Sequence, residues 1–275
     1  MNQITVIIQA KNEEKNIRAA LASCTFAQQV FIIDNFSTDQ TASIVRGFAN
    51  THLTQREFDG YATQKNWALA HLPISTEWIL FLDADEVIPR SLSEELTRIA
   101  CDPSSADCWY VNRRFYFLGR WIKHGGWYPS WHLRFFRRGE AVYEQRNIDE
   151  HMIPHGTVGY LENDLSHEDM NGLERWIDKH NTYSSFHAKE IFSKNRSGFT
   201  GNLLSTHPVE RKRALKIFFY RLPFRPLLRF FVMYVIQGGF LDGYQGFIFC
   251  ALRAIQEFHI NIKLKELKIS FMKRV

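Results

Sequence analysis

The sequence contains few cysteines, and none of them stands in a paired motif. Cys24, Cys101, Cys108 and Cys250 are scattered over 275 residues without a Cys-x-x-Cys spacing. This pattern excludes the common zinc motifs and a disulfide framework, both of which need clustered cysteines. We therefore expect reduced thiols, which are typical of cytosolic proteins.

Glycine-rich phosphate-binding loops are also missing. The sequence has neither a Gly-x-Gly-x-x-Gly segment nor a Walker loop, so the backbone amides of such a loop cannot cradle the phosphates of a nucleotide. If the protein binds a nucleotide, a metal ion and cationic side chains must balance the phosphate charge instead.

Two further absences concern membranes. The N-terminus leads directly into a strand pattern, without a signal peptide, so we expect the catalytic part to face the cytoplasm. The apolar run Phe230–Ile236 ends at Gln237-Gly238-Gly239, well short of the roughly 20 residues that span a bilayer. The sequence therefore predicts no transmembrane segment.

The net charge of +5 hides an asymmetry within the chain. From Ser205 onward there are 13 Lys and Arg against 4 Asp and Glu, whereas the preceding residues hold 21 basic and 25 acidic side chains. Between Arg211 and Arg229 the basic residues interleave with Phe and Leu. This composition is typical of helices that lie in an anionic membrane surface. The alternatives are an ordinary helical subdomain with a solvated basic face, and nucleic-acid binding, for which no motif is present.

Apolar strands and amphipathic helices alternate through the N-terminal part of the chain. Such alternation predicts an α/β fold with a mostly parallel sheet and helices on its faces. We also expect Asn12 to cap the first helix. Strands are expected at Ile4–Ala10, Gln29–Ile33 and Trp78–Leu82, with a weaker one near Leu53–Phe58, and helices at Ile17–Cys24, Ile44–Phe48, Tyr61–Leu72 and Leu92–Ile99.

The stretch Trp78–Glu86 carries the strongest functional signal. Five apolar residues lead into Asp83-Ala84-Asp85-Glu86, which places carboxylates at the C-terminal end of a buried strand, where open α/β sheets bind ligands. Asp83 and Asp85 can there reach one hard cation that also holds phosphate oxygens; an acidic surface turn is the alternative. Asp34 ends another strand and can accept from a base or a ribose hydroxyl, or serve as a turn residue.

Three segments together resemble glycosyltransferase family 2, the inverting enzymes with a GT-A fold. They are Val6–Glu14, Ile32–Thr41 and Leu80–Glu86, in the order and spacing of that family. Residues 1–204 would form the GT-A catalytic domain, and similarity to a subgroup of bacterial lipopolysaccharide-core glycosyltransferases extends through a C-terminal region, residues 205–275. Gln9 is a departure, because many relatives carry Pro there.

The resemblance implies roles in binding a nucleotide sugar, most simply a UDP-sugar. Asp34 would hold the uracil or ribose and Lys65 would lie near the diphosphate. Asp83 and Asp85 match the Asp-x-Asp motif, with Asp85 as the direct ligand of Mg²⁺ or Mn²⁺. His167 matches a histidine that is a third metal ligand or a diphosphate contact, with a structural histidine as the alternative. The nucleotide-sugar pocket would comprise Ala10, Glu13, Asp34, Lys65, Asp83 and Ala84.

An inverting transfer needs a base that takes the proton from the acceptor hydroxyl. In the family this base is an acidic residue that follows an arginine-rich strand, a place occupied here by Asn147–His151. Glu150 aligns best with the base, and Asp149 stands where a histidine is expected. Which of the two acts as the base remains open.

The segment Gly119–Pro129 is rich in aromatic, glycine and cationic residues. Indole rings and polar groups suit the apolar faces and hydroxyls of a sugar, so we assign Trp127 and His124 to acceptor binding. Arg134 could reach a phosphate of the acceptor. The alternatives are a rigid aromatic loop packed on the sheet, and a surface ion pair for Arg134.

These observations predict a metal-dependent inverting glycosyltransferase, peripheral on the inner face of the cell membrane. It would move a hexose from a donor such as UDP-glucose to a lipid-linked glycan or lipopolysaccharide-type acceptor. One alternative is a nucleotidyltransferase acting on a sugar phosphate, which usually carries a Gly-rich basic loop that is missing here. Another is a non-catalytic, membrane-docked glycan-binding module, against which the presence of both Asp83 and Asp85 argues.

Overall fold

The computed structural model describes residues 3–144, 151–196 and 224–272. The chain forms two compact units. The first comprises Met1–Lys123 and Trp127–Gly172, and the second comprises His124–Gly126 and Leu173–Val275. The expected domain boundary after residue 204 lies outside the described residues.

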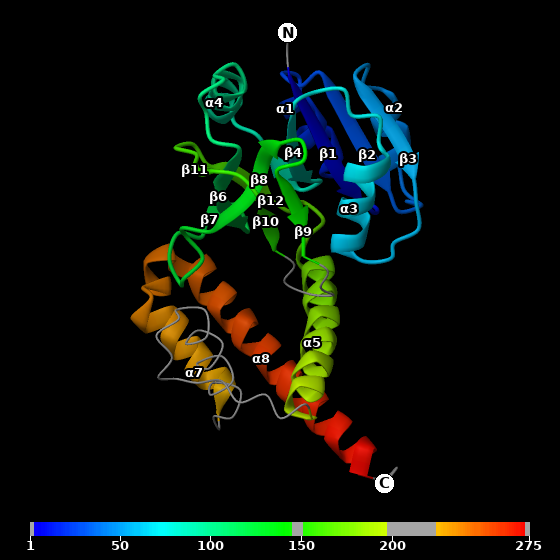
Figure 1. Ribbon diagram of the computed structural model, residues 1–275. Coiled ribbons are helices and arrows are strands. Elements are labelled where there is room, and N and C mark those ends of the chain that lie inside the picture. Colours follow the sequence, from blue (N-terminus) through cyan, green and yellow to red (C-terminus); the bar gives the residue numbers. More distant parts are fainter. Residues whose placement is uncertain (1–2, 145–150, 197–223, 273–275) are drawn as a thin grey trace. The chain divides into compact units, whose positions relative to one another are not determined.

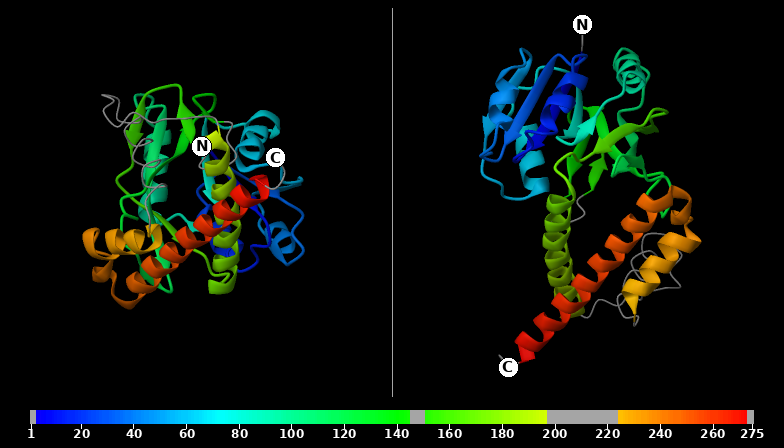
Figure 2. Two further views of the ribbon diagram at one scale, coloured as in Figure 1. Left: turned by 90° about the horizontal axis from the view of Figure 1, so that it is seen from below. Right: turned by 180° about the vertical axis from the view of Figure 1, so that it is seen from behind.

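The first unit is built on a mixed sheet whose strands run in the order β3-β2-β1-β4-β8-β6-β12-β5 (Figures 1 and 2). β1 to β4 are mutually parallel where they pair, β8 is antiparallel to both β4 and β6, and β12 is parallel to β6. The bounds are β1 (Ile4–Ala10), β2 (Gln29–Asp34), β3 (Thr51–Gln55), β4 (Trp78–Asp83), β5 (Glu86–Val87), β6 (Cys108–Phe117), β8 (Trp131–Arg137) and β12 (Leu165–Glu168).

Shorter strands complete the first unit. β7 (Arg120–Trp121) and β11 (Val158–Tyr160) add to β6, whereas β9 (Ala141–Tyr143) and β10 (Met152–Pro154) form a separate antiparallel pair. The helices are α1 (Ile17–Ser23), α2 (Thr41–Arg46), α3 (Tyr61–His71) and α4 (Arg90–Ala100). The α/β fold predicted from the alternating pattern is confirmed.

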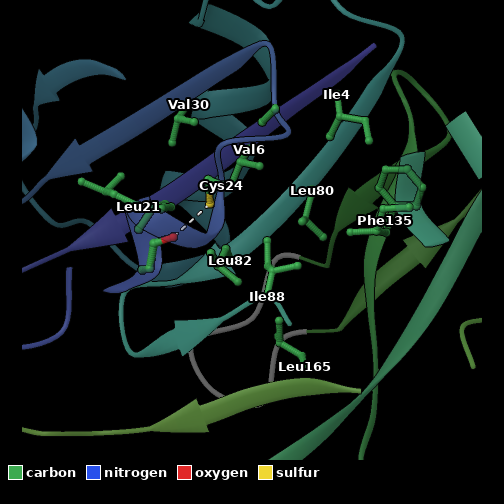
Figure 3. Packing of buried hydrophobic residues seen from close by; sticks show 14 of the residues in the cluster. Ile4, Val6, Leu21, Cys24, Val30, Leu80, Leu82, Ile88, Phe135 and Leu165 are labelled. Carbon is green, nitrogen blue, oxygen red and sulfur yellow. Dashed lines mark hydrogen bonds between the residues drawn. The ribbon is translucent and has the colours of Figure 1, made fainter. Parts of the chain in front are cut away.

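Two apolar clusters bury the two faces of the sheet, because successive strand residues point to opposite faces. On one face Val6 and Leu80 pack with Leu21 and Cys24 from the α1 region (Figure 3). On the other face Ile7 and Phe81 pack with Ala62 and Ala68 of α3. Asp83 follows Phe81 by two residues, so it extends the face that α3 covers.

The predicted cap of the first helix is wrong. α1 begins at Ile17, after Asn16. Asn12 instead has a left-handed backbone with φ of 54°, a conformation that asparagine tolerates better than most residues. Its side chain accepts a hydrogen bond from Thr38 N at 2.8 Å. Asn12 therefore shapes the loop after β1 and does not start the helix.

The second unit is helical. α5 (Leu173–Arg196) and α8 (Gly243–Met272) pack together through Ala188, Ile191, Ile260 and Leu264. α7 (Arg225–Phe231), the π-helix η1 (Val232–Ile236) and the 3₁₀ helix η2 (Gly239–Asp242) precede α8 and pack against it. In the described parts of the chain, every helix is too short or too polar to cross a bilayer.

Candidate active site

The carboxyl ends of three parallel strands meet at one edge of the sheet. In the pairing register, Ala10 of β1 lies opposite Asp34 of β2, and Gln9 lies opposite Asp83 of β4. The apolar residues of each strand fix this register, since a slip by one residue would turn the buried set outward. Ala10, Asp34 and Asp83 are thereby brought together, as the sequence predicts.

Asp83 forms a two-pronged ion pair with Arg134 of β8. Arg134 Nη2 lies 2.6 Å from Asp83 Oδ2, and Nη1 lies 3.1 Å from Oδ1. Glu86, which is completely buried, accepts a hydrogen bond from Asp83 N at 2.8 Å and lies 3.5 Å from both Arg134 and Arg113. These contacts form a row in which carboxylates and arginines alternate, in the order Asp83, Arg134, Glu86 and Arg113.

The charges around Asp83 keep it ionised. Burial by itself would raise the pKa of Asp83, but Arg134, Lys65 and Arg113 together hold that pKa well below its usual range. Burial would likewise lower the pKa of Arg134, yet Asp83 and Glu86 raise it well above its ordinary value. The Asp83 side chain keeps 37% of its surface exposed, so a fixed negative charge reaches the ligand side of the sheet.

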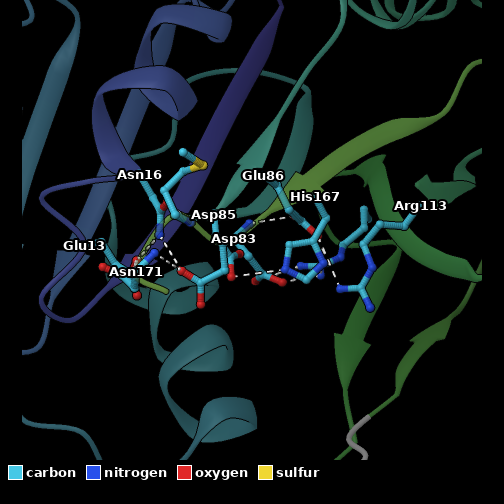
Figure 4. Close-up of polar contacts among 11 residues, drawn as sticks. Glu13, Asn16, Asp83, Asp85, Glu86, Arg113, His167 and Asn171 are labelled. Carbon is cyan, nitrogen blue, oxygen red and sulfur yellow. Dashed lines mark hydrogen bonds and ion pairs between the residues drawn. The ribbon is translucent and has the colours of Figure 1, made fainter. Parts of the chain in front are cut away.

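Asp85 faces His167 at the same edge (Figure 4). His167 lies opposite Glu86 in the pairing of β12 with β5, and its Nε2 lies 3.1 Å from Asp85 Oδ2. Glu168 N also donates to Asp85 O at 3.1 Å. The other ring nitrogen of His167, Nδ1, is buried and has no hydrogen-bond partner among the described residues. A turn of two residues and a short strand pair therefore bring together two of the three predicted metal ligands, Asp85 and His167.

A second polar cluster joins the loop after β1 to the segment after β12. Glu13 accepts from the side-chain amides of Asn16 at 2.7 Å and Asn171 at 2.9 Å. Asn16 also donates to Asp169 at 3.0 Å and accepts from Met170 N at 2.9 Å. Glu13, predicted to line the nucleotide pocket, is thus held by its neighbour Asn16 and by Asn171, which is far away in the sequence (Figure 4).

Asp34 is buried and satisfied from within the chain. Its carboxylate accepts from Ser37 N at 3.1 and 3.2 Å, from the Ser37 hydroxyl, and from Gln55 Nε2 at 3.0 Å. These contacts match the turn role that the sequence analysis kept as an alternative. Asp34 orders the loop after β2, which is also hydrogen-bonded to the loop after β1 through Lys11 and Asn12.

Lys65 lies on the buried side of α3. It is spaced by three residues from Ala62 and from Ala68, and its Nζ lies 4.6 Å from the centroid of the Tyr143 ring, within the range of a cation–π contact. Asn66 holds the backbone of Tyr143, donating to its carbonyl and accepting from its amide at 2.9 Å each. Tyr143 thus gives Lys65 a defined position.

The three predicted acceptor residues have different surroundings. Trp127 belongs to the first unit, and its ring lies 5.5 Å from Phe115, whose ring lies 5.3 Å from His167. His124 belongs to the second unit, where Asp242 accepts from its backbone amide at 2.8 Å and lies 2.8 Å from its Nδ1. Arg134 contacts Asp83, as described above. Asp149 and Glu150, the candidate bases, lie outside the described residues.

The family model of glycosyl transferase family 2 matches residues 5–165. The chain belongs to glycosyltransferase family 2. The lipopolysaccharide core biosynthesis glycosyltransferase LpsC of Rhizobium meliloti (strain 1021) is 27% identical over 267 residues, 95% of this chain and 91% of LpsC. An uncharacterised glycosyltransferase of Rickettsia typhi (strain ATCC VR-144 / Wilmington) is 24% identical over 283 residues, 98% of this chain and 89% of that protein.

Solved structures give more distant matches to this family 2 glycosyltransferase. S. aureus TarS, residues 1–349, matches with a TM-score of 0.44 and 15% identity, covering 93% of this chain and 91% of TarS. Glucosyl-3-phosphoglycerate synthase from Mycobacterium tuberculosis, in a complex with Mn²⁺, UDP and glucosyl-3-phosphoglycerate, matches with a TM-score of 0.34 and 19% identity. That match covers 42% of this chain and 44% of the synthase chain.

The side chains at this edge of the sheet suit a divalent metal ion that also binds oxygen atoms of a substrate. Across the described ranges, no three His, Cys, Asp or Glu side chains converge into a metal cluster. Asp85 and His167 supply one carboxylate and one imidazole. Mg²⁺ usually takes only one or two carboxylates and fills its other positions with water and substrate phosphate oxygens, and Mn²⁺ accepts the same ligand types.

Sequence reasoning missed several residues of this site. Arg113, Glu86, Asn16 and Asn171 had no assigned role, although Glu86 follows the Asp-x-Asp motif directly. His132 was also missed. Burial, together with Arg113 and Arg134, lowers the pKa of His132 to about 3, so this histidine stays neutral at physiological pH.

Replacing Arg134 by Met should destabilise the first unit at neutral pH, because Asp83 and buried Glu86 lose their shared cation. We expect a loss of roughly 2–4 kcal/mol, below the range for a fully buried pair because Asp83 is partly exposed. The pKa of Asp83 is lowered in the folded chain, so the difference from wild type should shrink as acid titrates Asp83. Urea unfolding at several pH values measures this dependence.

The matched control is Arg90→Met, which removes a fully exposed pair with Glu94 and should change the stability very little, because solvent screens such pairs. Equal losses for the two arginine variants, or a loss at position 134 that does not change with pH, would contradict the role given to the Asp83–Arg134 pair.

Proposed function

We propose that the protein transfers a hexose from a nucleotide sugar, such as UDP-glucose, to a lipid-linked glycan, with inversion at the anomeric carbon. The Asp85–His167 pair carries this proposal, because it lies beside an ionised Asp83 at the carboxyl edge of a parallel sheet. Such an edge is where α/β sheets bind nucleotides. The family membership supports the reaction class, and the LpsC relative supports a lipopolysaccharide-type acceptor.

In this proposal each residue of the edge has a role in holding the donor. Asp85 and His167 hold Mg²⁺ or Mn²⁺, which when bound neutralises the diphosphate leaving group. Asp83 and Glu86 keep the turn around Asp85 in place through Arg134. Ala10 and Ala84 leave room at the strand ends, and Glu13 and Asp34 order the loops that enclose the nucleotide.

Lys65 supplies the cationic side chain that a chain without a glycine-rich phosphate loop requires. Its contact with Tyr143 places the ammonium near Asp83, whose pKa it helps to lower. A diphosphate entering this edge would meet that positive charge directly. The absence of a phosphate-binding loop and the buried lysine on α3 therefore support the same donor site.

Glu150 takes the proton from the attacking hydroxyl, with Asp149 as the other candidate. The support is the resemblance of this segment to the family, in which an acidic residue after the arginine-rich strand is the base. We further propose that Trp127 and His124 contact the acceptor, and that the basic C-terminal region keeps the enzyme at the cytoplasmic face of an anionic membrane.

The donor and the metal can be tested together by measuring UDP release. We expect purified protein to release UDP from one member of a panel of UDP-sugars when Mg²⁺ or Mn²⁺ is present, and to stop when EDTA is added. Asp85→Asn should lower this release by at least roughly tenfold to a hundredfold, because losing even a residue that only supports a metal ligand costs that much. Release that survives EDTA at the full rate would contradict the metal-dependent reaction.

The choice of base can be tested with two isosteric variants. Glu150→Gln should reduce transfer to acceptor by at least about a hundredfold, since general-base catalysis contributes that much, while the affinity for UDP in a calorimetric titration stays unchanged. Asp149→Asn is the matched control and should keep most of the transfer rate. The opposite result would assign the base to Asp149. Full transfer rates in both variants would show that neither residue is the base.

A further inference from the structure

The second unit exposes large apolar side chains on neighbouring elements. Leu227 and Phe231, spaced by four residues, lie on one face of α7, and Phe224 directly precedes the helix; all three are at least half exposed. Phe240 and Leu241 of η2 and Tyr244 of α8 are equally exposed. We call these six residues the apolar surface. Six exposed large apolar side chains on neighbouring elements point to an interaction site.

Aromatic contacts join the elements beneath the apolar surface. The Tyr234 ring of η1 lies 5.1 Å from Phe230, 6.2 Å from Phe240 and 5.7 Å from Phe247. The backbones of η2 and α8 approach each other so closely that a Cβ on Gly246 would overlap the carbonyl oxygen of Gly239. Phe240 and Leu241 are therefore presented outward on a short turn with a fixed backbone.

No exposed carboxylate interrupts this surface. Between residues 224 and 262 the sequence has two acidic residues, Asp242 and Glu257. Asp242 is buried and bonded to His124, and Glu257 pairs with the buried Arg225. Both acids are thus engaged inside the unit, and neither side chain is exposed beside the apolar surface.

Cationic residues accompany the apolar ones. Arg229 lies on α7, and the sequence between residues 205 and 223 adds five Lys and Arg against one Glu. Exposed aromatic and aliphatic side chains in a part of the sequence rich in basic residues match the interfacial layer of an anionic bilayer, where rings sit among head groups and cations meet lipid phosphates. A soluble acidic protein would satisfy the cations but would leave most of the apolar surface wet.

We propose that the apolar surface inserts into the interfacial layer of an anionic lipid bilayer. This proposal rests on the proposed function. It names the side chains that hold the enzyme at the membrane, where a lipid-linked acceptor lies. The helices lie in the plane of the membrane surface and do not cross it.

Sedimentation with vesicles tests the proposal. The probe is vesicles of equal parts phosphatidylglycerol and phosphatidylcholine, with pure phosphatidylcholine for comparison. The double variant Phe240→Glu, Leu241→Glu should lower the partition coefficient at least about tenfold, since two apolar side chains are lost and two negative charges are gained. The control Phe186→Glu, on α5 with 47% exposure against 50% for Phe240, should bind like wild type.

UDP release in solution separates this proposal from the proposed reaction, because it should be the same in wild type and in all variants that fold. Thermal melting checks folding, and Tyr244→Glu replaces the double variant if that variant melts early. Wild-type protein that ignores anionic vesicles, or a double variant that binds them fully, would overturn the proposal. So would light scattering that shows a wild-type dimer and a monomeric double variant, because a second copy would then cover the surface.

Discussion

The ion pair between Asp83 and Arg134 is the interaction on which the rest of the site depends. Arg134 is buried in the centre of a sheet, where an unpaired charge would cost several kcal/mol. Asp83 and Glu86 both neutralise it, and Glu86 also accepts from Asp83 N. The same contacts therefore fix the turn that follows β4. Because Asp85 lies in this turn, its approach to His167 depends on the contacts of Arg134 with Asp83 and Glu86.

A chain of polar contacts connects this turn with the loops that enclose the proposed nucleotide site. Asp85 O accepts from Glu168 N, and the next residue, Asp169, accepts from Asn16. Asn16 in turn donates to Glu13, in the loop after β1. Buried polar networks of this kind rigidify a site only when each member is satisfied. A change at Asn16 or Asn171 would therefore disturb donor binding without touching the donor.

The sequence predicts the strand ends well because the signal is local. An apolar run that stops at an acidic residue defines both β2 with Asp34 and β4 with Asp83, and parallel pairing then brings the two ends together. The partners of these residues could not be predicted, because they depend on long-range pairing. Arg134 is 51 residues from Asp83, and Asn171 is 158 residues from Glu13. Only the order β4-β8-β6-β12 makes them neighbours.

Contacts between residues far apart in the sequence also explain why the surroundings of some residues were not predicted. His124 lies in an aromatic stretch that reads as one acceptor loop, yet three residues of that stretch belong to the helical unit through Asp242. Arg134 has the composition of a phosphate contact, but two carboxylates already hold it. The apolar surface of α7 and η2 is visible in the sequence only as interleaved Arg and Phe. Only the structure shows that Asp242 and Glu257 form their contacts inside the helical unit.

The central claim is that Asp85 and His167 hold the metal that binds the donor diphosphate. Anomalous scattering from crystals grown with Mn²⁺ and UDP measures this directly. The account predicts one strong manganese peak within bonding distance of Asp85 and His167, with the diphosphate on its open side. A peak at any other place in the chain, or bound UDP beside an Asp85–His167 pair without manganese, would contradict it.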